Sequence, residues 1–278
     1  MTRFSRGVKL RRSSSSPFGT PMPSYALVTG ASSGLGLALA EALARRGRNL
    51  LLVARYRDDL EPIAIEFTQR FGVEVLFRGC DLSEPLRLTG FLLELEESGQ
   101  HIDLLVNCAA LHSQGHFLAQ DWLREQDLIE LNMLALARLC HSIGNAMAVH
   151  GGGQILNVAS VAAFQPGPWM SSYAASKAYV LHLSEGLREE LRQSGIGVSV
   201  LCPGPLRVHG EQQRESRASR LPMTPEEVAL TAVLALERNK ALIIPGWRNR
   251  WLVRASRVAP RWLVRKALSS INRTAARA

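Results

Sequence analysis

The sequence predicts an α/β protein in which a doubly wound parallel sheet forms a single domain. Short apolar or β-branched runs alternate with amphipathic segments from residue 25 onward, which is typical of parallel strands joined by right-handed helical crossovers. A glycine-rich turn follows the first run, and no linker or internal repeat interrupts residues 25–245. A chain of 278 residues with 46% hydrophobic content can bury one large core.

The expected strands are short and apolar, and they lie at 25–29, 49–54, 73–77, 102–106, 153–158, 197–201 and 241–244. The expected helices fill the intervals at 35–46, 58–71, 84–98, 119–149, 172–194 and 225–237. The first helix contains "LALAEALARRG", whose apolar residues recur with helical spacing until Gly47 ends the pattern. Strands that alternate with helices in this way are expected to be covered on both faces.

The two ends of the chain differ from its body in charge. Residues 1–24 contain five Arg or Lys and residues 238–278 contain eleven, with no acid in either segment. Because the whole chain carries +9 and the ends together carry +16, the body carries −7, which disfavours a nucleic-acid-binding protein. The expected division is a basic extension at 1–24, a folded domain at 25–246 and a basic amphipathic tail at 247–278.

The extension is expected to be disordered, because it is rich in serine and poor in apolar residues. Its composition overlaps with that of an organelle transit peptide, and translation from Met22 is a further alternative. No apolar run in the chain approaches the roughly 20 residues of a membrane-spanning helix.

The cysteines and histidines indicate neither disulfides nor a metal site. His112 and His116 are four residues apart, but no acidic or cysteine partner accompanies them. Because the cysteines lack CxxC spacing, we expect reduced thiols and a cytoplasmic protein. The four cysteines are Cys80, Cys108, Cys140 and Cys202.

The turn after the first strand has the features of a phosphate-binding loop. Its sequence "TGASSGLG" places three glycines between a strand and a helix. Glycine lets the backbone approach a pyrophosphate closely, and the helix N-terminus offers free N–H groups to its charge. The turn therefore predicts a Rossmann-type dinucleotide site. Its expected cofactor-binding residues are Thr29, Gly30, Ser32, Ser33, Gly34, Leu35 and Gly36.

The end of the second strand favours NADP(H) over NAD(H). An acidic residue here would bond the ribose 2′-hydroxyl of NAD, but Ala54 stands at that position and Arg55 follows. An arginine pairs with a 2′-phosphate, so Arg55 is a candidate for that contact. In the alternative, Arg55 is an ordinary loop cation and Asp58 or Asp59 meets the ribose.

An ordered set of motifs over about residues 25–245 resembles the classical short-chain dehydrogenase/reductase family. The motifs are "TGASSGLG", "CDL" at 80–82, "VNCAA" at 106–110, Asn132 in "ELNML", Ser160 in "ILNVAS", "YAASK" at 173–177 and "CPGP" at 202–205. The resemblance implies an oxidoreductase that assembles as a homodimer or homotetramer through its long helices.

The resemblance also implies further cofactor contacts. Asp81 would meet the adenine amino group with Leu82 beside it, although "DLSE" also reads as a helix cap. Asn107 would stand at the end of the fourth strand, where it is a structural residue or an ordinary strand-end cap. Pro203 and Gly204 would complete the nicotinamide side.

Tyr173 and Lys177 predict an acid–base pair, because residues four apart share one helix face. A phenol with a free pKa of about 10 is a poor acid or base at neutral pH, and a nearby ammonium would lower that pKa. Ser160 would bond the substrate oxygen where charge develops. By resemblance, Lys177 would also hold the nicotinamide ribose, and Asn132 a water linking Lys177 to solvent. In the alternative, Tyr173 and Lys177 are an ordinary pair of residues four apart on the surface of a helix.

The sequence departs from the family pattern at two positions. Ala110 replaces the usual glycine after the fourth strand, which places a methyl group where the backbone passes the adenosine. Val208 stands where the family often has a threonine that bonds the nicotinamide carboxamide. Neither change removes a reacting group.

The substrate side is expected to combine an apolar wall with a basic loop. Phe164, Pro166 and Trp169 would wall the pocket and favour a hydrophobic carbonyl compound. Residues 205–222 carry Arg207, Arg214, Arg217 and Arg220, which suit either an anionic substrate or a solvated surface.

The tail at 247–278 predicts two basic amphipathic helices divided at Pro260. Its three tryptophans and many arginines suit contact with a membrane surface, or else cover of the substrate cleft or of a neighbouring subunit. Two rivals to a reductase are a non-catalytic NADP-sensing protein and a membrane-attached interaction protein on the same fold.

Overall fold

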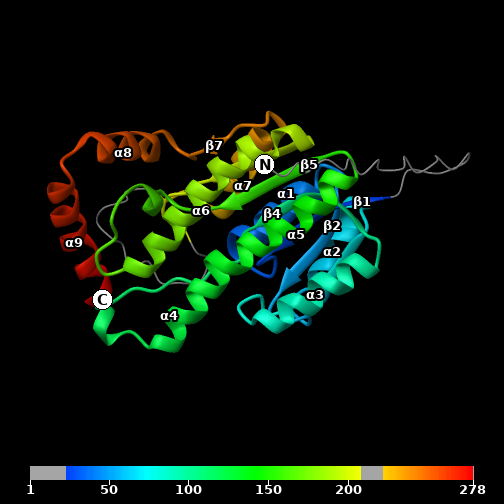
Figure 1. Ribbon diagram of the computed structural model, residues 1–278, viewed down its shortest axis with the longest axis horizontal. Helices are drawn as coiled ribbons and strands as arrows, with labels where there is room; N and C mark the ends of the chain where they lie inside the picture. The colour runs from blue at the N-terminus through cyan, green and yellow to red at the C-terminus, as the bar shows by residue number, and fades with distance from the viewer. Residues whose placement is uncertain (1–22, 208–221, 278) are drawn as a thin grey trace, which may run out of the picture.

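The computed structural model describes residues 23–207 and 222–277, and these residues build a seven-stranded parallel sheet (Figure 1). The strands are ordered β3-β2-β1-β4-β5-β6-β7, and every neighbouring pair is parallel. Their bounds are β1 Ser24–Thr29, β2 Asn49–Ala54, β3 Val75–Gly79, β4 His101–Asn107, β5 Gly153–Val158, β6 Ile196–Leu201 and β7 Leu242–Ile243. The chain order reverses at β1, which lies between β2 and β4. The predicted doubly wound sheet is confirmed.

Helices cover both faces of this sheet, as continuous apolar strands require. In β2, Leu50 and Leu52 belong to one buried cluster, while Leu51 and Val53 belong to the cluster on the opposite face. The first cluster is covered by α1 (Gly34–Ala44), α2 (Glu61–Phe71) and α7 (Pro225–Glu237). The second is covered by α3 (Pro85–Glu97), α5 (Leu136–Val149) and α6 (Ser171–Glu190).

The single helix expected at 119–149 is divided in the structure. A 3-10 turn, η1 (Phe117–Ala119), precedes α4 (Trp122–Ile129), whose N-cap Asp121 accepts a hydrogen bond from the Leu123 amide at 3.1 Å. A π-helical segment, η2 (Glu130–Ala135), then joins α4 to α5. Two other 3-10 turns are η3 (Val161–Phe164) and η4 (Leu191–Ser194), and η4 ends the segment expected as one helix at 172–194.

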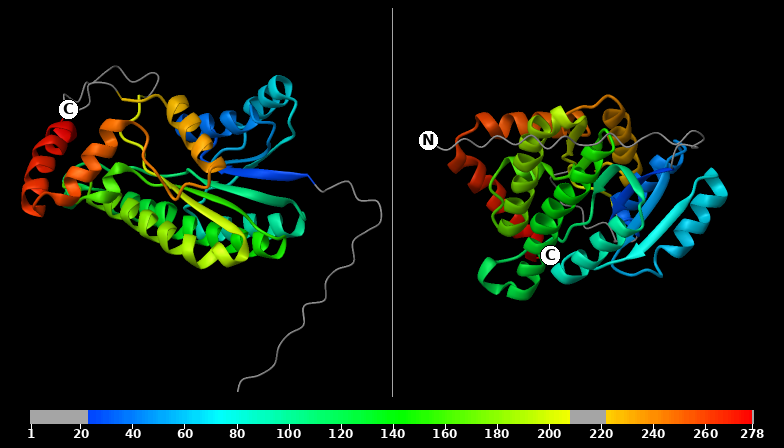
Figure 2. Two further views of the ribbon diagram at one scale, coloured as in Figure 1. Left: turned by 90° about the horizontal axis from the view of Figure 1, so that it is seen from above. Right: turned by 45° about the vertical axis from the view of Figure 1, so that its right-hand side comes forward.

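Two helices follow the sheet, α8 (Trp247–Val258) and α9 (Arg261–Arg277), with Pro260 between them. Both lie at the end of the molecule toward which the strands point, next to the loop before α6 (Figures 1 and 2). Among the helices of the described ranges, none is long and apolar enough to cross a membrane. Of the expected extension at 1–24, only Pro23 and Ser24 are among the described residues. Four residues of the expected substrate side lie outside them, namely Val208, Arg214, Arg217 and Arg220.

Candidate active site

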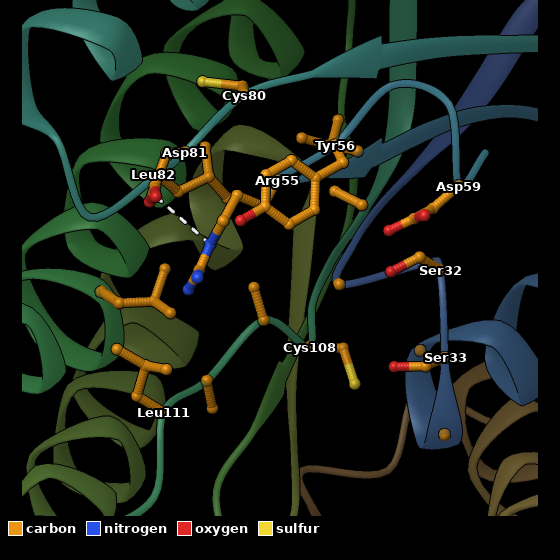
Figure 3. Close-up of a pocket in the computed structure, with 18 of the residues that line it drawn as sticks. Ser32, Ser33, Arg55, Tyr56, Asp59, Cys80, Asp81, Leu82, Cys108 and Leu111 are labelled. Carbon is orange, nitrogen blue, oxygen red and sulfur yellow. Dashed lines mark ion pairs between the residues drawn. The ribbon is translucent and has the colours of Figure 1, made fainter.

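A cavity of about 460 Å³ opens where the strand order reverses, between the carboxyl ends of β1, β2 and β4 (Figure 3). This is where doubly wound sheets bind their ligands. Most of the cofactor residues expected from the sequence line it, together with the substituted Ala110. Those lining residues are Gly30, Ser32, Ser33, Gly34, Leu35, Gly36, Arg55, Asp81 and Leu82.

The N-terminus of α1 faces this cavity with its backbone donors free of side-chain caps. Ser33 at the N-cap makes no side-chain hydrogen bond, and the first turn contains no acid. Gly34 has φ +53° and open space where a Cβ would be. At Gly36, by contrast, a Cβ would overlap the carbonyl of Gly30, so this glycine is required for packing. Uncapped donors beside an open cavity suit an anionic group such as a pyrophosphate.

Thr29 does not line the cavity but fixes its floor. Its buried hydroxyl accepts hydrogen bonds from the amides of Cys108 and Ala109, at 3.0 and 3.1 Å. It thereby ties the end of β1 to the loop after β4, and both Cys108 and Ala109 line the cavity.

The structure brings the two predicted adenosine-side contacts together. The Nε of Arg55 lies 3.2 Å from Oδ2 of Asp81, in an ion pair that Figure 3 marks on one side of the cavity. The other oxygen of Asp81 accepts hydrogen bonds from the amide and hydroxyl of Ser83, at 3.0 and 2.6 Å. Asp59 also lines the cavity, whereas Asp58 does not. A 2′-phosphate that pairs with Arg55 would therefore replace the Asp81 carboxylate as its partner.

Tyr173, Lys177 and Ser160 do not line this cavity but lie close to one another. The Nζ of Lys177 lies 5.7 Å from the centre of the Tyr173 ring, and the side chain of Ser160 lies close enough to Tyr173 to influence its pKa. Lys177 is only 3% exposed and donates a 3.0 Å hydrogen bond to the carbonyl of Val158. The two side chains are not an exposed surface pair.

The pKa of Tyr173 differs from the expectation. Burial raises this pKa, and its effect outweighs the lowering caused by the nearby side chain of Ser160. Burial also lowers the pKa of Lys177 to about 8, partly opposed by the thiols of Cys108 and Cys202. The expected net lowering of the tyrosine pKa is thus wrong for this structure, because desolvation acts on both groups and favours their neutral forms.

Asn132 lies in the π-helical segment and is 1% exposed. Its side chain accepts a hydrogen bond from the Leu111 amide at 2.8 Å and donates one to the Leu111 carbonyl at 2.9 Å. It also donates to the hydroxyl of Ser176 at 3.0 Å, and Ser176 donates to the Tyr173 carbonyl at 2.8 Å. Because Leu111 lines the cavity, Asn132 connects the cavity wall to the helix of Tyr173.

Asn107 points into the interior and does not line the cavity. It donates to Oδ1 of Asn157 at 2.9 Å, and Asn157 donates to Ser184 at 3.0 Å. These buried groups join β4, β5 and α6, which is the structural alternative for Asn107. Its own Oδ1 is buried without a hydrogen-bond partner.

Pro203 and Gly204 follow β6 and contact the substrate side. The carbonyl of Pro203 accepts a 3.0 Å hydrogen bond from Val161, the residue after Ser160. A Cβ at Gly204 would lie 2.6 Å from side-chain atoms of Asn249, so α8 packs directly on this turn. No pattern in the sequence predicted that Asn249 lies at this turn.

His112, considered from the sequence only as a metal ligand together with His116, also lies near the reacting groups. Its ring centre lies 4.5 Å from that of Tyr173. Partial burial and the charge of Lys177 lower the pKa of His112, which favours the neutral imidazole. Its position five residues after Asn107, past the carboxyl end of β4, was the available signal.

The expected apolar wall is held in place by the two C-terminal helices. The guanidinium of Arg257 lies 5.0 Å from the Phe164 ring, and Asn272 donates to the Pro168 carbonyl at 2.9 Å. Trp169 has a strained φ of +69°, with Arg273 at 5.8 Å from its ring and the ring of His116 at 5.5 Å. Backbone strain at this position is typical of a functional loop.

Comparisons with known proteins agree with this geometry. A model of the short chain dehydrogenase family matches residues 24–219. The 7beta-hydroxysteroid dehydrogenase of Collinsella aerofaciens is 27% identical over 233 residues, which are 81% of this chain and 87% of that protein.

Two solved structures are similar over 90% of this chain and 95% of their own. One is a short-chain dehydrogenase from Sphingobium yanoikuyae in complex with NADPH, at 34% identity and a TM-score of 0.75. The other is a bulky-bulky ketone specific alcohol dehydrogenase from Comamonas testosteroni, at 31% identity and a TM-score of 0.74.

Proposed function

Because the chain belongs to the short chain dehydrogenase family, we propose that it transfers a hydride between NADP(H) and a carbonyl or alcohol substrate. The observation that carries this proposal is the buried Lys177, one helical turn from Tyr173, with its Nζ 5.7 Å from the centre of the tyrosine ring. A non-catalytic cofactor sensor or a scaffold for protein interactions would not need a phenol and an amine held together in this way.

Ser160 and Tyr173 would act on the substrate oxygen. The Oγ of Ser160 accepts a 3.2 Å hydrogen bond from the Ala162 amide, which leaves its own proton available for another partner. Because burial raises the pKa of Tyr173, its phenol stays protonated at neutral pH and can donate a proton during carbonyl reduction. During alcohol oxidation the tyrosine oxygen would instead accept the proton of the alcohol. The raised pKa of Tyr173 favours this step once the phenolate has formed.

Lys177 and Asn132 would support this proton transfer. Lys177 carries its charge below a pKa of about 8, and that charge stabilises negative charge developing on the tyrosine oxygen. Asn132 holds the cavity wall at Leu111 and, through Ser176, the backbone of Tyr173. The water link to solvent expected for Asn132 is part of the proposal.

The residues around the cavity fit a dinucleotide. The uncapped N-terminus of α1 would receive the pyrophosphate, and Arg55 would receive a 2′-phosphate in exchange for Asp81. A bound nicotinamide dinucleotide would supply or accept the hydride. The NADPH complex of the similar Sphingobium enzyme supports the preference for NADP(H), and the missing acid at Ala54 supports it independently.

The proposed substrate is a bulky, apolar ketone or the corresponding alcohol. Phe164 and Trp169, which are expected to wall the substrate side, are apolar. Of the similar proteins, one is a hydroxysteroid dehydrogenase and another is an alcohol dehydrogenase specific for bulky-bulky ketones. We further propose a cytoplasmic homodimer or homotetramer that pairs through the long helices.

The experiment that tests the function is an assay of NADPH and NADH oxidation with a panel of aliphatic, aryl and steroid ketones. We expect turnover with at least one bulky ketone and a higher kcat/KM with NADPH. If both cofactors bind but no ketone or alcohol supports turnover, the cofactor sensor replaces the enzyme.

A further inference from the structure

The helices α8 and α9 expose large apolar side chains that the rest of the described chain does not cover. Trp247 and Trp251 are each 62% exposed, and Trp262 is 61% exposed. Leu252, Val258, Leu263 and Ile271 are exposed as well. A concentration of this kind in two adjacent helices marks an interaction surface rather than ordinary scattered exposure.

One face of α8 is docked and the opposite face carries the tryptophans. Val253 is 5% exposed and Asn249 packs against Gly204, so this side faces the body of the protein. Trp247, Trp251 and Val258 recur at intervals of four and seven residues and therefore share another face. The tryptophan face is thus directed away from the part of the protein on which α8 packs.

The surface is also strongly basic. Residues 247–277 contain nine Arg or Lys and no Asp or Glu. The guanidinium groups of Arg248 and Arg254 lie 5.4 and 5.8 Å from the rings of Trp247 and Trp251. Basic groups beside exposed tryptophans are what an interfacial helix presents to anionic headgroups and the acyl boundary.

Side-chain contacts attach α8 and α9 to the loop before α6. Arg257, Asn272 and Arg273 attach α8 and α9 to Phe164, Pro168 and Trp169, the loop that walls the substrate side. Both helices lie beyond the carboxyl ends of the strands (Figures 1 and 2). The exposed face therefore sits beside the site proposed for catalysis.

We propose that α8 and α9 form an interfacial anchor that lies flat on an anionic lipid surface, with Trp247, Trp251 and Trp262 inserted. A second copy of the chain fits the surface poorly, because a two-fold interface would place the same acid-free basic patch on both sides. An anionic bilayer supplies the opposite charge and the apolar layer together. Binding of this surface to lipid does not require turnover. Because the surface lies beside the proposed catalytic site, an apolar ketone would enter that site from the lipid.

The test is co-sedimentation of the full chain with vesicles of phosphatidylcholine alone or with 30% phosphatidylglycerol. We expect binding to the anionic vesicles, a blue shift of tryptophan fluorescence and weaker binding at high salt. The double variant Trp247→Ala/Trp251→Ala should bind at least tenfold more weakly. Val149→Ala, a change at an exposed apolar residue at the C-terminal end of α5, should bind like the wild type.

Charge is tested with two variants of equal net charge. Arg250→Glu/Arg254→Glu should lose binding to anionic vesicles at least tenfold, whereas Arg45→Glu/Arg192→Glu, on other elements, should retain it. Circular dichroism and solution turnover of a water-soluble ketone check that each variant is folded, and they also separate this proposal from the proposed function.

Three results would overturn the anchor. They are failure of the wild type to bind anionic vesicles at low salt, equal loss in the tail and control variants, and a smaller oligomer in the tail variants without any vesicle binding. The last result would assign the surface to a neighbouring subunit.

Discussion

The adenosine side of the cavity and the catalytic group on α6 both pair a cationic side chain with a partner, but in different surroundings. The side chains of Arg55 and Asp81 are 48% and 21% exposed, whereas Lys177 as a residue is 3% exposed. Water screens the first pair, so it can exchange its partner for a ligand at small cost. Burial shifts the pKa of both Tyr173 and Lys177, so a change there alters the free energy of folding as well as turnover.

Of substitutions at the two cationic side chains, Lys177→Met is expected to have the larger effect. We expect kcat to fall about a hundredfold, within the range for acid–base support, because the charge that assists Tyr173 is lost. Stability should rise instead. A pKa lowered from 10.5 to about 8 corresponds to about 3 kcal/mol against the charged form, and loss of the hydrogen bond to Val158 returns about 1 to 2 kcal/mol.

The sign of the pH dependence follows from this lowered pKa. The charged lysine destabilises the folded state fully below pH 8, and the cost disappears between pH 8 and 10.5 as the folded protein loses the proton first. The stability advantage of Lys177→Met, measured by urea unfolding at several pH values, should therefore shrink across that window. A constant or growing advantage would contradict a buried, destabilised ammonium.

Asn132→Ala is expected to reduce stability by about 2 kcal/mol, because the Leu111 amide and carbonyl lose their side-chain partners. The KM for the cofactor should rise as well, since Leu111 lines the cavity. Asn145→Ala on the exposed side of α5 is the matched control and should change neither quantity. Equal effects of both substitutions would remove the positioning role of Asn132.

Arg55→Asp should have the smallest effect on folding and a selective effect on the cofactor. Because the pair with Asp81 is half exposed, we expect a change in unfolding free energy below about 0.5 kcal/mol. The kcat/KM ratio of NADPH to NADH should fall at least tenfold, with kcat little changed. An unchanged ratio would favour the alternative in which Asp59 binds the ribose.

The structural features that were predictable from the sequence depend on the spacing of neighbouring residues along the chain. The turn around Gly30 and Gly36 requires particular residue types at adjacent positions, and Tyr173 and Lys177 share a helix face because they are four apart. The sheet topology follows from the order of strands and helices. Each of these patterns can be recognised without knowing what packs around it.

The remaining features depend on contacts between distant segments. Arg55 meets Asp81 only because β2 and β3 are paired neighbours, and Asn249 reaches Gly204 only because α8 folds back on the turn after β6. The expected direction of the Tyr173 pKa was wrong because burial is a property of the assembled core. The π-helical segment around Asn132 left no visible mark in an otherwise regular helical pattern.

The central claim is that Tyr173 is the proton donor of a reductase. The most direct measurement compares wild type and Tyr173→Phe for NADPH binding by fluorescence titration and for single-turnover NADPH oxidation with the best bulky ketone. We expect equal NADPH binding and a rate at least a thousandfold lower in the variant, because the ring is kept and the proton-donating hydroxyl is removed. A rate within tenfold of wild type, with binding unchanged, would contradict it.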